Sequence, residues 1–275
     1  MHARHVAHAF RRDSDRAGVP TLPWTLICGT LGLMVGSFLN VVIHRVPRKE
    51  SVVRPRSHCA ACGTQLADRD NLPVLSWLLL RGRCRTCKEP ISARYPLVEL
   101  ATGGLFVTAA LRFGADWALP AYLLFLAALL AISMIDLEHY IVPNRIVYPT
   151  LFGAVPLLAI AALADGDWRS LGTALVGALV AGTGLLVIHL ISPRSLGFGD
   201  VRLAVILGLF LGWIDLAHVA LGLFMGFLLG AVGGVALIAL RLKKRKDRVP
   251  FAPFLALGAL VAVLAGNPIL DWYIR

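Results

Sequence analysis

Charged side chains are scarce in this chain, and acidic ones are the scarcest. Of its 275 residues only 16% are charged, with 16 Asp or Glu against 27 Lys or Arg. Soluble domains carry roughly 25% charged residues, so a soluble globular enzyme is disfavoured. Cysteine is also rare, at five residues, which excludes a disulfide-stapled miniprotein. The apolar content of 57% and the mean hydropathy of +0.73 exclude a disordered chain.

The apolar residues lie in long runs, as in a protein that crosses a membrane several times. A spanning helix needs about 20 mostly apolar residues, and eight runs are candidates. They cover approximately 24–43, 96–113, 118–135, 146–164, 171–192, 201–213, 217–240 and 251–270. The sequence therefore predicts an all-α polytopic membrane protein with about eight transmembrane helices.

The runs also suggest a division of the chain. We expect an N-terminal tail (1–23), a first transmembrane helix (24–43), a cytoplasmic loop domain (44–95) and a seven-helix membrane domain (96–275). No Ala-x-Ala cleavage site follows the first run, so we interpret it as a retained span and not as a signal peptide.

Basic residues concentrate in two loops between the apolar runs. Eleven Lys or Arg lie between Arg45 and Arg94, and six more lie in 241–250. Cytoplasmic loops of membrane proteins collect such residues. With eight spans both loops fall on one side, which we expect to be cytoplasmic, and both termini fall on the other.

The net charge of +11 would suggest nucleic acid in a soluble protein. No aromatic-interleaved basic surface accompanies it, so we expect no nucleic-acid partner. The loop 44–95 has 11 bases and four acids (Glu50, Asp68, Asp70 and Glu89), a net charge of +7. We expect it to lie against anionic lipid headgroups, which contribute about 1 kcal/mol per basic residue near the surface.

Four of the five cysteines form two C-x-x-C pairs within this loop. The pairs are Cys59 with Cys62 and Cys84 with Cys87, separated by 21 residues. This spacing predicts a closed four-thiolate zinc site, which would be structural because no coordination position is open. Disulfides are the rival, and a reducing cytoplasm disfavours them. Cys28 lies in the first run and is interpreted as a packing residue.

Two carboxylates lie at the edges of apolar runs, where ionisable residues are candidates for function. Asp136 ends the third run and Asp200 opens the sixth. Both are predicted at cytoplasmic helix ends, so they share one depth and can face each other. Paired carboxylates can hold one proton between them, so that one acts on water while the other donates to a peptide carbonyl. This is aspartic peptidase chemistry.

Simpler interpretations remain for each carboxylate. Asp200 could cap its own helix, and Asp136 could be an interfacial anchor. Gly197 and Gly199 flank Asp200 and would let backbone approach closely, from substrate or from the other aspartate. Glu99 could support the site or pair with an arginine. Glu138 and His139 are interpreted as solvated or supporting groups, Asp215 as an ordinary residue of a short loop, and His58 as an ordinary surface histidine.

Several motifs together resemble the bacterial type IV prepilin peptidases. They are Gly36-Ser-Phe-Leu-Asn40 through Pro47, both cysteine pairs, Asp70-Asn-Leu-Pro through Trp77, Ile91-Ser-Ala-Arg-Tyr-Pro through Glu99, Ile135-Asp136-Leu-Glu-His139, Gly197-Phe-Gly-Asp200 and Phe251-Ala-Pro-Phe-Leu-Ala-Leu-Gly258. Ala252 and Lys88 stand where the family more often has Gly. The resemblance covers most of 29–260, and the segment 151–190 adds little to it.

The resemblance implies an activity. Such enzymes, in the bacterial inner membrane, cut basic leader peptides from prepilins and pseudopilins at the cytoplasmic face. The family's two aspartates map onto Asp136 and Asp200. Many members also methylate the new N-terminus with S-adenosylmethionine, but no residues here can be assigned to that cofactor. An ion-coupled transporter and a non-catalytic zinc-knuckle scaffold are the alternatives from other classes, and a preflagellin-type peptidase without methylation is weakened by the large cysteine loop.

Overall fold

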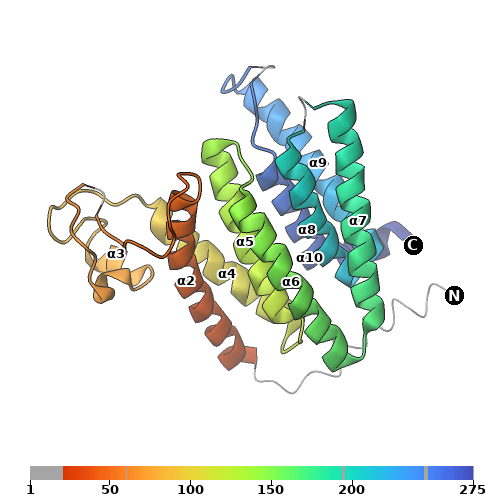
Figure 1. The fold of residues 1–275 in the computed structure, drawn as a ribbon, viewed down its shortest axis with the longest axis horizontal. Coiled ribbons are helices and arrows are strands. Elements are labelled where there is room, and N and C mark those ends of the chain that lie inside the picture. Colours follow the sequence, from red (N-terminus) through yellow and green to blue (C-terminus); the bar gives the residue numbers. More distant parts are fainter. Residues whose placement is uncertain (1–20, 60, 194–195, 245–246, 275) are drawn as a thin grey trace.

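The protein is a bundle of long helices with a cysteine-containing loop at its side (Figure 1). The computed structural model describes residues 21–59, 61–193, 196–244 and 247–274, so most of the expected tail 1–23 lies outside it. The described residues form helices and two isolated β-bridges. The long helices are α2 (Thr21–Arg45), α4 (Arg94–Phe113), α5 (Leu119–His139), α6 (Asn144–Asp165), α7 (Trp168–Ile191), α8 (Phe198–Ile214), α9 (Leu216–Ala239) and α10 (Ala252–Ile274).

Each of the eight predicted runs becomes one of these helices, and the all-α membrane fold is confirmed. Seven of the helices are long and apolar enough to cross a membrane. The exception is α8, which contains the predicted run 201–213. This helix has 17 residues. It would be about 26 Å long at 1.5 Å per residue, slightly short of a hydrocarbon core. Eleven of its residues are buried, so α8 lies inside the bundle.

Short connections with clear end signals join the helices. Gly114 and Gly166 follow α4 and α6 with positive φ of +60° and +67°, which glycine adopts without strain. Asp167 and Asp215 cap α7 and α9 by accepting N–H groups of the first turn. Asp215 is therefore an ordinary capping residue, as its place in a short loop suggested.

The central helix α8 is held by close packing on both sides. A Cβ at Gly208 would lie 2.1 Å from the carbonyl oxygen of Gly177, so α7 and α8 meet at backbone distance. On the other side the ring of Phe210 stacks on Phe125 with centroids 4.3 Å apart. The hydroxyl of Tyr122 donates to the Phe210 carbonyl at 2.8 Å. These contacts fix α8 against α5, the two helices that carry Asp200 and Asp136.

The bundle has two chemically different ends. At one end α2 begins beside the end of α4, because the indole of Trp24 donates to the carbonyl of Gly114 at 2.9 Å. At the other end Arg94 of α4 forms an ion pair with Glu138 of α5, and Lys243 donates to the hydroxyl of Tyr140 at 3.0 Å. Both basic loops therefore lie at the same end as Asp136.

The loop 44–95 lies beside α2 and not across the end of the bundle (Figure 1). It contains a short 3-10 helix, η1 (Asp68–Asn71), and α3 (Leu75–Leu79). It is fastened to α4 where the buried carboxylate of Glu99 accepts the N–H of Val74 at 2.7 Å. The amide of Asn40 in α2 donates to the carbonyl of Tyr95 at 3.1 Å, which fixes the C-terminal end of the loop against α2.

Candidate functional site: an aspartate pocket and a four-cysteine centre

Asp136 lies in the last turn of α5 and is 5% exposed. Its Oδ2 accepts the backbone N–H of Ala252, at the start of α10, at 3.0 Å. α5 ends three residues later at His139, and the next residue, Tyr140, has a left-handed backbone with φ of +56° and ψ of +38°. This turn bends the chain back over the end of the helix, so the residues after α5 lie next to the carboxylate.

Asp200 is the third residue of α8 and is 8% exposed. Its Oδ2 accepts the N–H of Gly197 at 3.1 Å, and its own N–H donates to the Gly197 carbonyl at 3.0 Å. This reciprocal pair closes the first turn of α8. Asp200 thus has the capping role that was its simpler interpretation, and its carboxylate also faces a pocket.

The two aspartates line one pocket of about 240 Å³. Its other lining residues are Tyr140, Ile141, Val142, Gly197, Gly199 and Arg202. The structure therefore brings together four residues that the sequence singled out: both aspartates and both glycines. The pocket lies at the end of the bundle that carries the basic loops, between the C-terminus of α5 and the N-terminus of α8.

Gly199 is required for the wall of this pocket. A Cβ there would lie 2.8 Å from the Cβ of Val142, a distance that real side chains do not adopt. The chain after α5 therefore crosses directly over the start of α8. The close approach expected at this glycine is made by Val142, which is neither substrate nor the other aspartate. A Cβ at Gly197 would lie 3.2 Å from Oδ2 of Asp200.

Four pocket residues were not recognised from the sequence: Tyr140, Ile141, Val142 and Arg202. The ammonium group of Lys243 lies 5.3 Å from the centre of the Tyr140 ring and is hydrogen-bonded to its hydroxyl; this raises the pKa of Lys243 above its usual value. Arg202 lies over the ring of Phe198 at 4.6 Å and is hydrogen-bonded to Asn144. The spacing of Tyr140, four residues after Asp136, was the one available signal.

The four predicted cysteine ligands form a second centre, in the loop. The sulfurs of Cys59, Cys62, Cys84 and Cys87 all lie within 4.8 Å of one another. The Sγ atoms of Cys59 and Cys87 are 3.7 Å apart. A tetrahedral zinc with Zn–S bonds of about 2.3 Å separates its sulfurs by about 3.8 Å, so the four thiols fit zinc. All four cysteines are free, which agrees with the zinc interpretation and not with the rival disulfides.

The two cysteine knuckles have the same backbone design. Cys59 and Cys84 each donate an N–H to the carbonyl five residues on, at 2.9 and 2.8 Å. Each also accepts the N–H of the residue four positions on, which is Gly63 in one knuckle and Lys88 in the other. Repetition of one turn explains how two short segments present four sulfurs to a common point.

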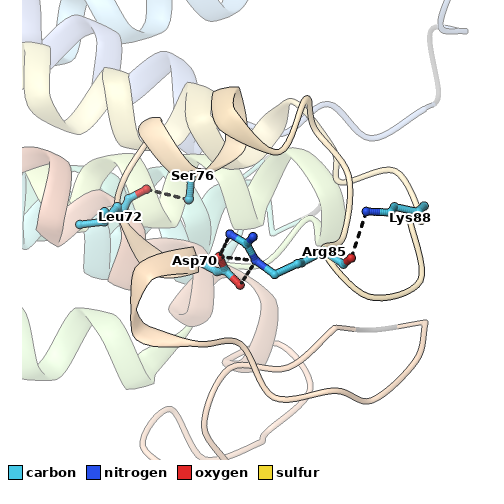
Figure 2. A network of polar contacts seen from close by, with 5 residues as sticks. All are labelled: Asp70, Leu72, Ser76, Arg85 and Lys88. Carbon is cyan, nitrogen blue, oxygen red and sulfur yellow. Dashed lines mark hydrogen bonds and ion pairs between the residues drawn. The ribbon is translucent and has the colours of Figure 1, made fainter.

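A salt bridge ties the second knuckle to η1. The guanidinium of Arg85 donates to both carboxylate oxygens of Asp70, at 2.7 to 3.1 Å (Figure 2). These hydrogen bonds hold the pKa of Asp70 below its usual value. In the same view Lys88 donates to the carbonyl of Arg85 at 3.1 Å. The Asp70 motif therefore supports the four-cysteine centre and does not reach the aspartate pocket.

Two further acids have structural partners. Glu99 accepts the N–H of Val74 and so fastens the loop, whereas the sequence left open a pairing with arginine. Glu138 forms an ion pair with Arg94, which joins the end of the cysteine loop to the helix that carries Asp136. The Nδ1 of His58 lies 3.2 Å from the carbonyl oxygen of Arg56, a local contact within the loop.

Comparison with known proteins identifies the family of the chain. Residues 30–113 match the family model described as the bacterial peptidase A24 N-terminal domain. Residues 123–238 match the model of the type IV leader peptidase family. No solved structure matches the chain.

Three relatives named prepilin leader peptidase/N-methyltransferase illustrate the similarity. The protein of Aeromonas hydrophila is 36% identical over 286 residues, covering 94% of this chain and 96% of that one. The protein of Pseudomonas aeruginosa is 34% identical, covering 92% and 94%. That of Myxococcus xanthus is 42% identical over 216 residues, covering 76% of this chain and 61% of its own length. The chain is therefore a multi-pass membrane enzyme that belongs to the type IV leader peptidase family.

Proposed function

We propose that this protein removes the basic leader peptide from type IV prepilins or pseudopilins, with Asp136 and Asp200 as its catalytic residues. The observation that carries the proposal is the pocket that both aspartates line, at the end of the bundle. Membership of the leader peptidase family and the names of the relatives support the substrate class. Gly197 and Gly199 support the site by shaping the start of α8.

The chemistry needs one charged and one protonated carboxylate. The charged one takes a proton from water as the water attacks the peptide carbonyl carbon, and the protonated one donates to the carbonyl oxygen. Burial of both side chains, at 5% and 8% exposed, favours sharing one proton, because two nearby charges in a poorly solvated pocket repel each other. Tyr140 and Arg202 also line the pocket, and a peptide would enter past them from the end of the bundle.

We place this pocket at the cytoplasmic face of the bacterial inner membrane. Both basic loops lie at the same end as the pocket, which supports this orientation through the positive-inside rule. We further propose that residues 44–95 form a zinc-stapled cytoplasmic unit and that 96–275 form the peptidase domain. Cys59, Cys62, Cys84 and Cys87 would hold the structural zinc.

Methylation of the new N-terminus by S-adenosylmethionine is the second activity that the names of the relatives suggest for this chain. The loop has a pocket of about 410 Å³, lined by Leu80, Arg81, Arg83, Cys84 and Lys88. Its cations suit a carboxylate, but no lining acid could bind ribose hydroxyls or balance a sulfonium. The lining does not fit the whole cofactor, so we assign no residue to it.

The same region supports a membrane-surface role for the loop. Leu72, Leu75 and Leu79, in and before α3, are 51%, 59% and 80% exposed. They precede in sequence Arg81 and Arg83, which line the cationic pocket. Exposed leucines next to arginines are typical of segments that lie in the headgroup region. We propose anionic lipids as the partner, and replacing the three leucines with serine should reduce the dependence of activity on anionic lipid in proteoliposomes.

Cleavage of a prepilin by purified protein tests the function. Wild type is compared with Asp136→Asn and Asp200→Asn, with retained zinc and an unchanged melting temperature as controls for folding. We expect each substitution alone to abolish cleavage, because neither carboxylate can serve as both base and acid. Normal cleavage by both variants would reject the assignment and restore the transporter and scaffold alternatives.

A further inference from the structure

Arg202 is the cation among the residues that line the aspartate pocket. It lies two residues after Asp200 in α8 and is half-buried. A mobile cation in such a pocket would pair with a carboxylate, because opposite charges attract more strongly where water is scarce. In the part of the chain that the structure describes, Arg202 forms no ion pair with either aspartate. Other contacts must therefore hold its guanidinium.

Two contacts hold the guanidinium of Arg202. Its Nη1 donates to the side-chain oxygen of Asn144, the first residue of α6. The cation also lies 4.6 Å from the centre of the Phe198 ring, one turn earlier in α8, a distance typical of a cation–π contact. Neither Asn144 nor Phe198 lines the aspartate pocket. Both contacts therefore direct the charge of Arg202 away from the two carboxylates.

The backbone around Asn144 fixes the position of its amide. Pro143 precedes it with an extended backbone, and the Pro143 carbonyl accepts the N–H groups of Ile146 and Val147 at 3.0 and 3.2 Å. Val142 lies against Gly199 of α8, where a Cβ would come within 2.8 Å of the Val142 Cβ. The segment that forms the pocket wall thus also places Asn144 beside Arg202.

The other charged groups on the elements packed around the pocket have partners of their own, and none of them lines the pocket beside the aspartates. Movement of Arg202 is therefore what would change the charge next to the two carboxylates. Arg45 of α2 donates to the Ser51 carbonyl, Arg94 of α4 pairs with Glu138 of α5, and His139 lies 3.9 Å from Glu138; Arg145 of α6 lies 3.4 Å from the Glu50 carbonyl, His189 of α7 lies 2.8 Å from the Leu196 carbonyl, and Lys243 before α10 donates to Tyr140.

We propose that Asn144 is a positioning residue that holds Arg202 away from Asp136 and Asp200, so that the two aspartates can keep the proton they share. This rests on the proposed peptidase function. Once released, the charge of Arg202 would enter the pocket and stabilise both carboxylates in the charged form, and the shared proton would pass to water. The pair would then lack the carboxyl that protonates the peptide carbonyl oxygen. Asn144 acts through Arg202 and needs no contact with the substrate.

Cleavage of a prepilin by the purified full-length protein tests this role. Asn144→Ala should lower kcat by about 10²-fold, the lower end of what a positioned acid contributes. Asn144→Asp keeps an oxygen for Arg202 and should cleave much faster than Asn144→Ala. Adding Arg202→Gln to Asn144→Ala removes the released charge and should recover most of the lost rate, which a merely structural role of Asn144 would not allow. A wild-type rate in Asn144→Ala, or no recovery in the double variant, would overturn the proposal.

Infrared spectroscopy detects the shared proton without substrate. The C=O band of protonated carboxyl groups is recorded as the difference from a variant with both Asp136→Asn and Asp200→Asn, so that other buried carboxyls such as Glu99 cancel. At one pH we expect the band in wild type, its loss in Asn144→Ala and its return when Arg202→Gln is added. An unchanged band in Asn144→Ala would contradict the proposal.

The proposed function is tested separately by the two aspartate variants. Normal prepilin cleavage by Asp136→Asn and by Asp200→Asn would reject the peptidase assignment of the pair. Loss of cleavage in both, together with a wild-type rate and an unchanged band in Asn144→Ala, would reject only the role of Asn144. The two failures are therefore distinguishable.

Discussion

Lys88 occupies in the second cysteine knuckle the position that Gly63 occupies in the first. Both donate an N–H to the carbonyl of the first cysteine of their pair, and both have a left-handed backbone, with φ of +61° and +67°. Glycine adopts this conformation without a cost in free energy, whereas a residue with a Cβ is strained in it. Lys88, which stands where the family more often has glycine, therefore leaves the turn intact and adds backbone strain.

Replacing Lys88 with glycine should make the four-cysteine centre more stable. We expect a gain of about 1 kcal/mol from relief of the left-handed backbone, corresponding to roughly fivefold slower loss of zinc to a chelator. The exposed bond from Lys88 to the carbonyl of Arg85 is a minor loss. The measurement is the rate of zinc release from detergent-solubilised protein.

The matched control is Gly63→Lys. A Cβ at Gly63 has no neighbour within 4 Å, so its substitution changes the backbone preference without a steric clash. We expect faster zinc release by a similar factor. Equal release rates from wild type and both variants would show that the knuckle geometry does not depend on this residue.

Gly199→Ala should disrupt the aspartate pocket without touching either carboxylate. The new methyl group would lie 2.8 Å from the Val142 Cβ, so the segment that forms the pocket wall must move. A displacement of about 1 Å in an active site can cost 10²-fold in rate, and we expect a loss in kcat of that order for prepilin cleavage. Val142→Gly removes the clashing atom, so the double variant should recover part of the rate. No recovery would place the effect elsewhere.

Glu99 should hold the cysteine loop against α4 through its carboxylate oxygen. Val74 has a strained backbone for a β-branched residue, with φ of +59°, and its N–H is bound by Glu99. Glu99→Ala leaves this N–H without its acceptor, which costs about 1–3 kcal/mol of stability. The segment between η1 and α3 should then become sensitive to protease. Glu99→Gln keeps an acceptor oxygen and should protect the segment better. Equal cleavage of the two variants would contradict this role.

The Asp70–Arg85 pair should make the loop acid-sensitive even without zinc. The pKa of Asp70 is lower in the folded loop than its ordinary value of about 3.9. Its stabilisation is therefore complete above that value and is lost as the pH falls through the folded pKa. In metal-free protein, amide hydrogen exchange over 68–85 should be slower in wild type than in Asp70→Asn at pH 7. The two should converge once the pH falls below the folded pKa of Asp70, and a difference that persists after Asp70 is protonated would exclude this cause.

Local features of the sequence were enough to predict the helices and the clustering of four cysteines. Apolar runs of spanning length became the long helices, because in lipid a segment must satisfy its own backbone. Two C-x-x-C pairs became one cluster, because each pair is a self-contained turn. The depth of Asp136 and Asp200 followed from their places at run ends, so that their meeting in one pocket was predictable in outline.

What each aspartate touches was decided only by the tertiary structure. The donor to Asp136 is a backbone N–H 116 residues away, and a backbone group leaves no mark in a sequence pattern. The neighbour of Gly199 is Val142, brought there by the turn at Tyr140. Glu99 found a backbone partner in the loop where an arginine was considered. Sequence determines which segments enter the membrane and which residues carry chemistry, whereas the packing of α5, α8 and α10 against one another determines which atoms meet.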